Sequence, residues 1–165
     1  MNQATTPFPR PEHDHASCVQ TALLRAEQLC RKRGARLTVL RRRVLELVWD
    51  SHAPVGAYAL LDRMASGKSR PAPITVYRAL DFLQAHGLIH RVESLNAFVG
   101  CEHPGSGHGS QFMICRGCRA VAEIHDARLA RAIERTATEG GFALVERRLE
   151  LEGWCRHCAA ERSDG

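Results

Sequence analysis

The sequence predicts an α+β protein with two domains, a winged helix followed by a smaller α/β domain that binds metal. Three observations lead to this prediction. Apolar residues at helical spacing dominate the first half, two short extended runs follow them, and the last third contains two Cys-x-x-Cys pairs. Residues 101–110, which are rich in glycine and histidine, are predicted to be the linker between the domains.

The predicted winged-helix domain covers residues 16–100 and follows a predicted disordered tail, residues 1–15. Its helices are predicted from apolar residues three and four positions apart, and from the caps, glycines and prolines that end such runs. Four helices are expected, at residues 18–33, 38–50, 58–64 and 74–86. Residues 88–93 and 97–101 are expected to pair as a two-stranded hairpin, which would be the wing. We assign no role to Cys18 and expect Cys30 to be buried.

The predicted C-terminal domain, residues 111–158, contains strands and one helix. Strands are expected at residues 111–114, 120–124 and 142–152, and a helix at residues 126–139 with Asp126 as its N-cap. In the last strand the even positions from Glu146 to Glu152 are charged, which is typical of a sheet with one face in water. Residues 159–165 are predicted to be a polar tail.

Positive charge is concentrated in the first domain. The net charge is +5, and residues 1–96 contain 14 Lys and Arg against 8 Asp and Glu, whereas residues 97–165 contain 9 against 10. This excess favours nucleic acid as a partner of the first domain, with an ordinary solvated surface as the alternative. The first turn of the fourth helix offers Thr75, Tyr77 and Arg78, which suit base contacts in a DNA major groove. A surface helix with one stray arginine is the alternative there.

The sequence contains no apolar run long enough to cross a membrane and no secretory signal. We therefore expect a cytoplasmic protein whose seven cysteines stay reduced. Under those conditions Cys115, Cys118, Cys155 and Cys158 are expected to bind Zn²⁺ as four thiolates in a closed, structural site. Two disulfides are the alternative.

Four more possible ligands lie around the linker: His90, Cys101, His108 and Glu123. Zn²⁺ accepts such a mixed set, which we expect to be weaker and more exchangeable than four thiolates. Because the ligands come from both domains and the linker, binding would fix how one domain lies on the other. His103 and His125 are close in sequence and could replace a member of the set. A surface role for His90 and a solvated Glu123 are the alternatives.

The run TVYRALDFLQAHGLIHRVES at residues 75–94, the His- and Gly-containing linker and the two Cys-x-x-Cys pairs resemble the ferric uptake regulator family of metal-dependent repressors. The resemblance covers roughly residues 20–158 and is strongest to the zinc uptake regulators. It implies a homodimer formed by C-terminal dimerisation domains, with two Zn²⁺ per chain. It also implies binding to double-stranded DNA at AT-rich inverted repeats, and repression of zinc-uptake genes when zinc is ample.

The resemblance also implies roles for particular residues. Structural zinc would lie on the cysteine quartet, and regulatory zinc on the four ligands around the linker. DNA contacts would fall on Tyr58 and Arg78, with Tyr77 and Arg41 as helpers.

Two departures from the family pattern bear on these expectations. Residues 37–41 read Leu-Thr-Val-Leu-Arg where the family often has Leu-Thr-x-Gln-Arg, and only His103 and His108 remain of a His-rich run. The thiolate of Cys101 favours zinc over iron. The other hypotheses are a family member that senses iron, manganese or peroxide, a zinc metalloenzyme, and a zinc-stabilised scaffold. An enzyme is disfavoured because both predicted sites have four ligands, whereas catalytic zinc usually keeps an open position.

Overall fold

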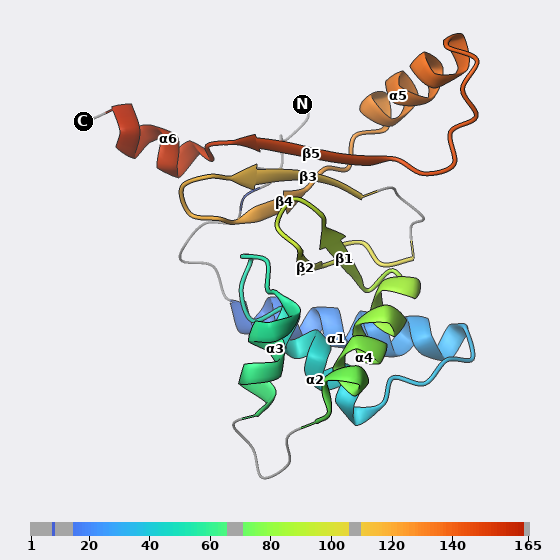
Figure 1. Ribbon diagram of the computed structural model, residues 1–165, viewed down its shortest axis with the longest axis vertical. Helices are drawn as coiled ribbons and strands as arrows, with labels where there is room; N and C mark the ends of the chain where they lie inside the picture. The colour runs from blue at the N-terminus through green and yellow to red at the C-terminus, as the bar shows by residue number, and fades with distance from the viewer. Residues whose placement is uncertain (1–7, 9–14, 66–70, 106–109, 164–165) are drawn as a thin grey trace.

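The computed structural model describes residues 8, 15–65, 71–105 and 110–163. Four helices form one end of the molecule, a three-stranded sheet with two helices forms the other, and a two-stranded wing lies between them (Figure 1). The predicted tail at residues 1–15 lies outside the described residues except for Phe8 and His15, which begins the first helix. Among the described residues, no helix is both long and apolar enough to span a membrane.

The N-terminal domain has the four predicted helices around one apolar core. They are α1 (His15–Lys32), α2 (Val39–Val48), α3 (Ala57–Met64) and α4 (Pro73–Ala85). Thr38 caps α2, since its hydroxyl accepts the backbone N–H of Arg41 at 3.4 Å. Gly87, at φ +65°, ends α4 in the left-handed conformation that glycine adopts most easily. The predicted burial of Cys30 is confirmed.

The wing consists of β1 (Ile89–Val92) and β2 (Ala97–Gly100), which pair antiparallel as predicted. An isolated antiparallel β-bridge between Val55 and Phe98 connects the wing to the segment that precedes α3. Gly100 lets the backbone of β2 approach Trp49 closely, because a Cβ at this position would lie 2.1 Å from the indole ring. No side chain fits there, so β2 lies directly on Trp49.

The C-terminal domain is a sheet of order β4-β3-β5 with two helices. Its elements are β3 (Ser110–Cys115), β4 (Val121–Glu123), α5 (Ala127–Glu139), β5 (Arg148–Gly153) and α6 (Arg156–Ser163). β3 and β4 form an antiparallel hairpin, and α5 carries the chain over to β5, which pairs parallel with β3. Asp126 caps α5 as predicted, accepting N–H bonds from Arg128 and Leu129 at 2.7 and 3.3 Å.

Two sequence predictions for this domain differ from the structure. The strand expected at residues 142–152 begins only at Arg148, where its described pairing with β3 starts opposite Ser110. Val145, expected to face the core, is 97% exposed. The segment expected to be a polar tail from residue 159 continues α6 as far as Ser163.

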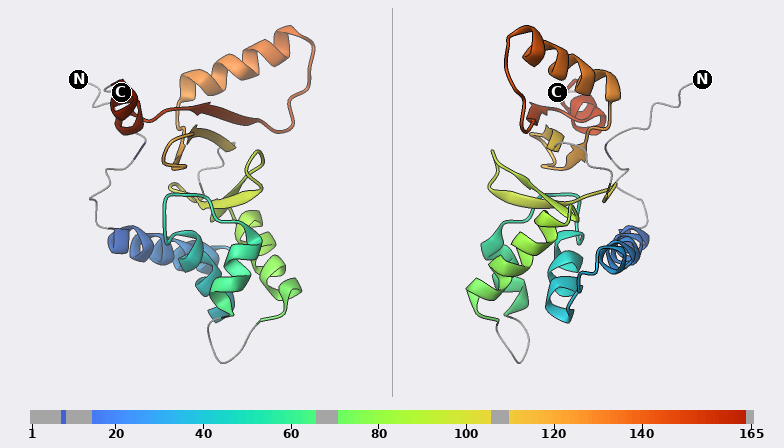
Figure 2. Two further views of the ribbon diagram at one scale, coloured as in Figure 1. Left: turned by 60° about the vertical axis from the view of Figure 1, so that its left-hand side comes forward. Right: turned by 90° about the vertical axis from the view of Figure 1, so that its right-hand side faces the viewer.

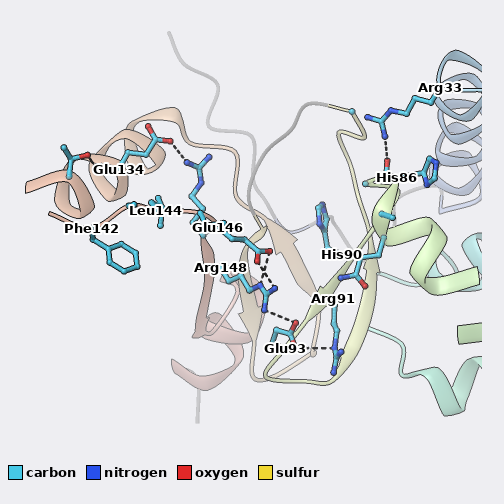
Figure 3. Close-up of a pocket in the computed structure, with 18 residues that line it drawn as sticks. Arg33, His86, His90, Arg91, Glu93, Glu134, Phe142, Leu144, Glu146 and Arg148 are labelled. Carbon is cyan, nitrogen blue, oxygen red and sulfur yellow. Dashed lines mark hydrogen bonds and ion pairs between the residues drawn. The ribbon is translucent and has the colours of Figure 1, made fainter. Parts of the chain in front are cut away.

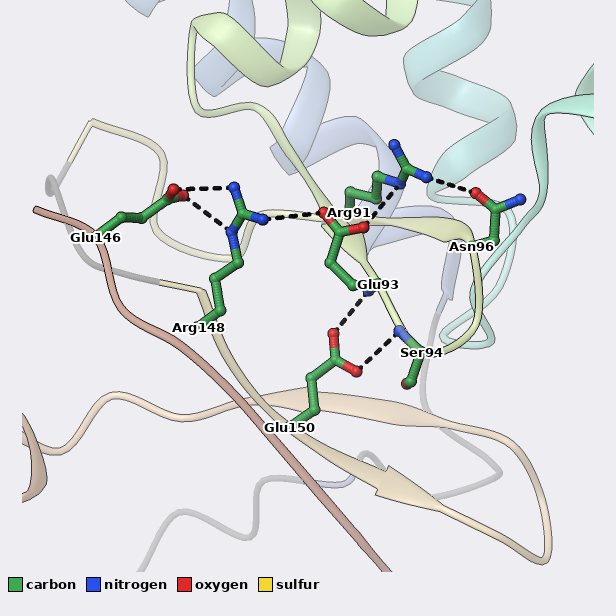
Figure 4. Close-up of polar contacts among 7 residues, drawn as sticks. All are labelled: Arg91, Glu93, Ser94, Asn96, Glu146, Arg148 and Glu150. Atoms are coloured by element: carbon green, nitrogen blue, oxygen red, sulfur yellow. Dashed lines mark hydrogen bonds and ion pairs between the residues drawn. The ribbon is translucent and has the colours of Figure 1, made fainter.

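The wing and the sheet share a second, smaller apolar core. Val92 of the wing packs with Phe112, Ile114 and Val121 of the sheet, and all four are buried. Polar contacts close the same junction at the wing tip, where Glu150 of β5 accepts the backbone N–H groups of Glu93 at 2.7 Å and Ser94 at 3.1 Å (Figure 4). The two domains therefore contact each other mainly through the wing.

Beside this contact lies an open cleft of about 1030 Å³ (Figure 3). It is bordered by the C-terminal end of α4, the wing and residues 142–148, and His90 faces it from β1. The junction is thus packed on one side and open on the other.

Candidate metal centres

The two Cys-x-x-Cys pairs meet where the parallel strands β3 and β5 end side by side. Cys115 ends β3 and pairs with Gly153, so Cys155 arrives directly beside it. The four sulfur atoms all lie within 4.8 Å of one another. Cys118 Sγ is 3.9 Å from Cys155 Sγ, close to the ~3.8 Å edge of a tetrahedron with Zn–S bonds of about 2.3 Å. None of the seven cysteines forms a disulfide, so the quartet fits Zn²⁺ and the disulfide alternative is wrong.

Backbone groups prepare this quartet to bind a cation. Burial raises the pKa of the Cys115 thiol, but backbone N–H groups of Cys155, Cys118 and Gly117 outweigh burial and lower it to about 6. A hydrogen bond with Cys155, together with burial, raises the pKa of Cys158 to about 12. The Cys115 thiolate therefore forms readily, whereas a positive ion beside the Cys158 thiol would favour its ionisation.

Two glycines that shape the metal centres were missed by sequence reasoning. A Cβ on Gly117 would lie 2.8 Å from Cys158 Sγ. The turn at residues 115–118 (the first knuckle) can therefore approach the turn at residues 155–158 (the second knuckle) only with glycine there. Gly100 has the same role beside Trp49, one residue before Cys101. The available signal was their position, between two knuckle cysteines and next to a predicted ligand.

The second predicted set of metal ligands, the one around the linker, comes together where the wing meets β4. His90 Nε2 lies 2.9 Å from Glu123 Oε1, and their side chains are 12% and 3% exposed. Cys101 follows β2 and is also buried. The ligand atoms of His90, Cys101 and Glu123 all lie within 4.8 Å of one another, so the structure brings together three of the four predicted ligands. His108, the fourth, lies outside the described residues.

This junction site is buried, and the Glu123 carboxylate acts on the ionisable groups around it. Burial, followed by the nearby Glu123 carboxylate, raises the pKa of Cys101 to about 12. Burial and Glu123 also raise the pKa of Glu102 above its usual value. The backbone N–H of Glu102 donates to Glu123 Oε2 at 3.1 Å and holds that carboxylate in place. A divalent cation would relieve this repulsion, which suits a metal site.

Two further histidines stand next to the junction site. His103 Nδ1 is 3.0 Å from His125 Nε2, and His125 Nε2 is 3.3 Å from Glu123 Oε2. The described residues therefore offer His125 as a neighbour that reaches the same carboxylate. The sequence prediction that these histidines could replace one ligand remains a prediction.

The predicted DNA-contacting residues lie on the surfaces of α3 and α4. α4 buries Val76, Ala79, Leu80 and Leu83, and Tyr77 and Arg78 are exposed on the other side, as predicted. Thr75 in the first turn is exposed as well. The first turn of α4 lies at the end of the molecule remote from α5 and α6 (Figure 1). Tyr58, in the first turn of α3, is 78% exposed.

Arg41 is placed differently from these exposed residues. Its guanidinium lies 3.5 Å above the ring of Phe82, and its Nη1 donates to the Arg36 carbonyl at 2.7 Å. In this structure Arg41 thus connects α2 to α4.

Comparisons with known proteins agree with this architecture. A model described as the ferric uptake regulator family matches residues 32–152. The zinc uptake regulation protein of Escherichia coli K12 is 38% identical over 140 residues, which cover 84% of this chain and 82% of that protein. A solved structure described as a zinc uptake regulator complexed with zinc and DNA has a TM-score of 0.81 at 36% identity, covering 88% of this chain and 97% of that one.

A further relative, XcZur, has been solved in two states. Both are 43% identical to this chain and cover 87% and 86% of it, and 98% and 97% of their own lengths. The holo structure has a TM-score of 0.77, and the apo structure 0.52. At equal identity this chain thus resembles the holo arrangement more closely. Because the family model spans most of the chain and the E. coli relative is alike over nearly its whole length, the chain belongs to the ferric uptake regulator family.

Proposed function

We propose that the chain is a zinc-responsive transcriptional repressor that binds operator DNA as a zinc-loaded homodimer and controls zinc-uptake genes. One observation carries the proposal: a buried set of metal-ligand side chains draws His90 from the wing and Glu123 from the sheet. Metal at this position ties the DNA-facing domain to the other domain. The names of the relatives, which include zinc and DNA, support the same function.

We further propose two Zn²⁺ per chain with different tasks. The cysteine quartet stabilises the C-terminal domain, since its thiols are brought together by strand pairing within that domain. The junction site regulates, with His108 as fourth ligand to His90, Cys101 and Glu123. The thiolate and imidazole ligands favour Zn²⁺ over Fe²⁺ and Mn²⁺, which separates this proposal from a regulator of iron or manganese uptake.

The junction ligands act on the balance between domain orientations. Only orientations that bring His90 and Cys101 to Glu123 assemble the full set, so metal shifts the population toward them. The higher TM-score against the holo relative than against the apo relative supports this view, since this chain has the ligands assembled. If the assembled orientation is also the one that fits an operator, metal and DNA reinforce each other.

For the DNA contacts we propose the first two turns of α4. Arg78 can pair bidentately with guanine, and Tyr77 and Thr75 are also exposed in these turns. Tyr58 of α3 adds an exposed aromatic ring. Arg41 acts as a helper, by holding α4 against α2 through Phe82. A regulator of this kind works on the chromosome, so we propose a cytoplasmic location.

The proposed dimer has an apolar surface to cover. Among the described residues of α5 none is buried, although the apolar residues Leu129, Ala132 and Ile133 share one face of the helix. β5 is an edge strand of the sheet, and Leu151 on it is exposed. A second copy that packs on α5 and extends the sheet at β5 would bury both.

The test is a fluorescence anisotropy titration with a duplex selected from a random library by the zinc-loaded protein. With the cysteine quartet kept loaded, we expect Zn²⁺ to raise DNA affinity and a chelator to reverse this. Glu123→Gln should remove the zinc effect, because the carboxylate charge is lost at nearly constant shape. Fe²⁺ and Mn²⁺ should be weaker effectors. DNA binding that is indifferent to zinc would overturn the regulatory part of the proposal.

A further inference from the structure

We propose a third metal site, formed by His15 and Cys18 of α1 and His52 of the α2–α3 connection, which binds Zn²⁺. The ligand atoms of these three side chains all lie within 4.8 Å of one another. The group is separate from the cysteine quartet and from the junction ligands. The binding proposed here does not depend on the regulatory function proposed above.

The geometry places the three side chains around one point. His15 and Cys18 are three residues apart on α1, so they lie on the same face one turn apart. The His52 ring meets the His15 ring edge-on, with centroids 4.8 Å apart. In a tetrahedral zinc site with Zn–N near 2.0 Å and Zn–S near 2.3 Å, ligand atoms of such a set lie roughly 3.3–3.5 Å apart. Small side-chain rotations therefore suffice to complete the set.

The chemistry of the set selects the kind of ion. Two imidazoles and one thiolate suit Zn²⁺ and similar borderline metals, and they do not suit Mg²⁺ or Ca²⁺, which prefer oxygen ligands. All three residues are half-buried. The described residues thus supply three protein ligands, and one water molecule would complete a tetrahedral set. A three-ligand site with one water is expected to exchange its metal more readily than the closed quartet.

This site lies largely outside the part of the chain that resembles the family. The family match covers residues 32–152, so it includes His52 but neither His15 nor Cys18. Sequence reasoning gave Cys18 no role because its partner His52 is distant in the chain and joins it only through the packing of α1 against α2. The competing explanation is that Cys18 only packs against the apolar core, which it also contacts.

The position of the site gives it a structural consequence. The backbone carbonyl of His52 accepts the N–H of Val121 in β4 at 3.1 Å. His52 and Glu123 also line the same small cavity of about 20 Å³, together with Trp49. Metal bound to His52 would therefore fix the first turn of α1 to the loop that contacts the C-terminal domain beside the junction site.

The experiment uses full-length protein with zinc in the quartet, in a Cys101→Ser background. In this background a sulfur-to-cobalt charge-transfer band on adding Co²⁺ reports a thiolate ligand outside both other sites. We expect one equivalent of Co²⁺ to give the band, and Cys18→Ser to abolish it. Cys30→Ala is the matched control: Cys30 is a buried thiol of the same helix outside every metal-ligand group, and this variant should keep the band.

His52→Gln provides a second variant that leaves the packing of Cys18 intact. It should weaken Co²⁺ binding by more than about tenfold, since it removes one of three protein ligands. Circular dichroism confirms that each variant is folded. No charge-transfer band in the Cys101→Ser protein, a band that survives Cys18→Ser, or unchanged affinity in His52→Gln would each overturn the proposal.

Discussion

The protonation of Cys101 is central to the chemistry of the proposed junction site. It is buried beside Glu123, and burial and that carboxylate raise its pKa to about 12. The thiol is therefore protonated at neutral pH until a cation arrives, so a proton has to leave when the metal binds.

This protonation leads to a prediction for metal binding. Zinc binding at the junction should release the Cys101 proton, and zinc affinity should fall as the pH is lowered because protons then compete more strongly. Calorimetric titrations in buffers of different ionisation enthalpy measure the release. In Cys101→Ser the released proton should disappear, and equal release in both proteins would show that another group supplies it.

The cysteines of the two centres should respond differently to the same substitution. Cys101→Ser should leave the protein folded but raise the zinc concentration needed for DNA binding by more than about 100-fold, since it removes a ligand and not merely an outer partner. Cys115→Ser should instead destabilise the C-terminal domain, because zinc binding there is part of its folding free energy. Thermal unfolding and operator titrations separate the two effects. If Cys101→Ser unfolds the protein, Cys101 is structural and the division of tasks is wrong.

For single residues, the sequence indicated which Cys, His and Glu side chains come together at the quartet and the junction. It did not indicate the close approaches between segments that are distant in the chain. Cys-x-x-Cys spacing is local and survives in any fold, so the quartet could be recognised directly. The junction ligands could be proposed because a short list of His, Cys and Glu flanked the linker. Gly100, Gly117 and the Cys18–His52 pair could not, since their roles depend on approaches between segments distant in the chain.

Among the elements, α4 is the one expected to carry DNA recognition. Arg78→Ala should lower operator affinity by about 1–3 kcal/mol and relax sequence preference at one position, because a bidentate base contact is lost. Arg135→Ala is the control: Arg135 is an exposed arginine on α5 in the other domain, and its removal should leave affinity nearly unchanged. Equal losses in both variants would indicate nonspecific charge and not readout by α4.

The wing and β5 form the element contact that the sequence did not predict. Burial raises the pKa of Glu150, but hydrogen bonds from Ser94 and Glu93 outweigh burial and lower it below the ordinary value of 4.5 (Figure 4). Since the folded pKa is the lower one, the stabilisation is present above pH 4.5 and is lost as the pH falls through the folded pKa.

Glu150→Gln should therefore lower the free energy of unfolding by about 1 kcal/mol near neutral pH. The difference from the original protein should shrink in acid, where Glu150 is protonated in both states. Denaturant unfolding of both proteins across this pH range measures it, and shared metal sites cancel in the comparison. A difference that does not change with pH would contradict the assignment.

Element prediction succeeded where capping and periodicity are strong, as in α2 with Thr38 and α5 with Asp126. It was wrong for the start of β5: the residues from Phe142 onward alternate like a strand, but among the described residues the pairing with β3 starts only at Arg148. The sequence likewise gave no sign of α6, a polar helix that begins at Arg156 within the second knuckle.

For the whole molecule, the order of the helices, the wing and the sheet could be predicted, but the way the wing meets the sheet could not. That contact depends on Val92 and Phe112 packing in a core shared by the wing and the sheet. With this contact formed, the structure is more like the holo than the apo structure of XcZur.

The central claim is that the junction ligands couple zinc binding to DNA binding through the orientation of the domains. The most direct test is the zinc affinity of the junction site, measured with and without saturating operator DNA while the quartet stays loaded. Linkage requires that DNA raise zinc affinity by the same factor by which zinc raises DNA affinity, roughly 5- to 150-fold for a typical coupling. Equal zinc affinities in the presence and absence of bound operator would contradict the account.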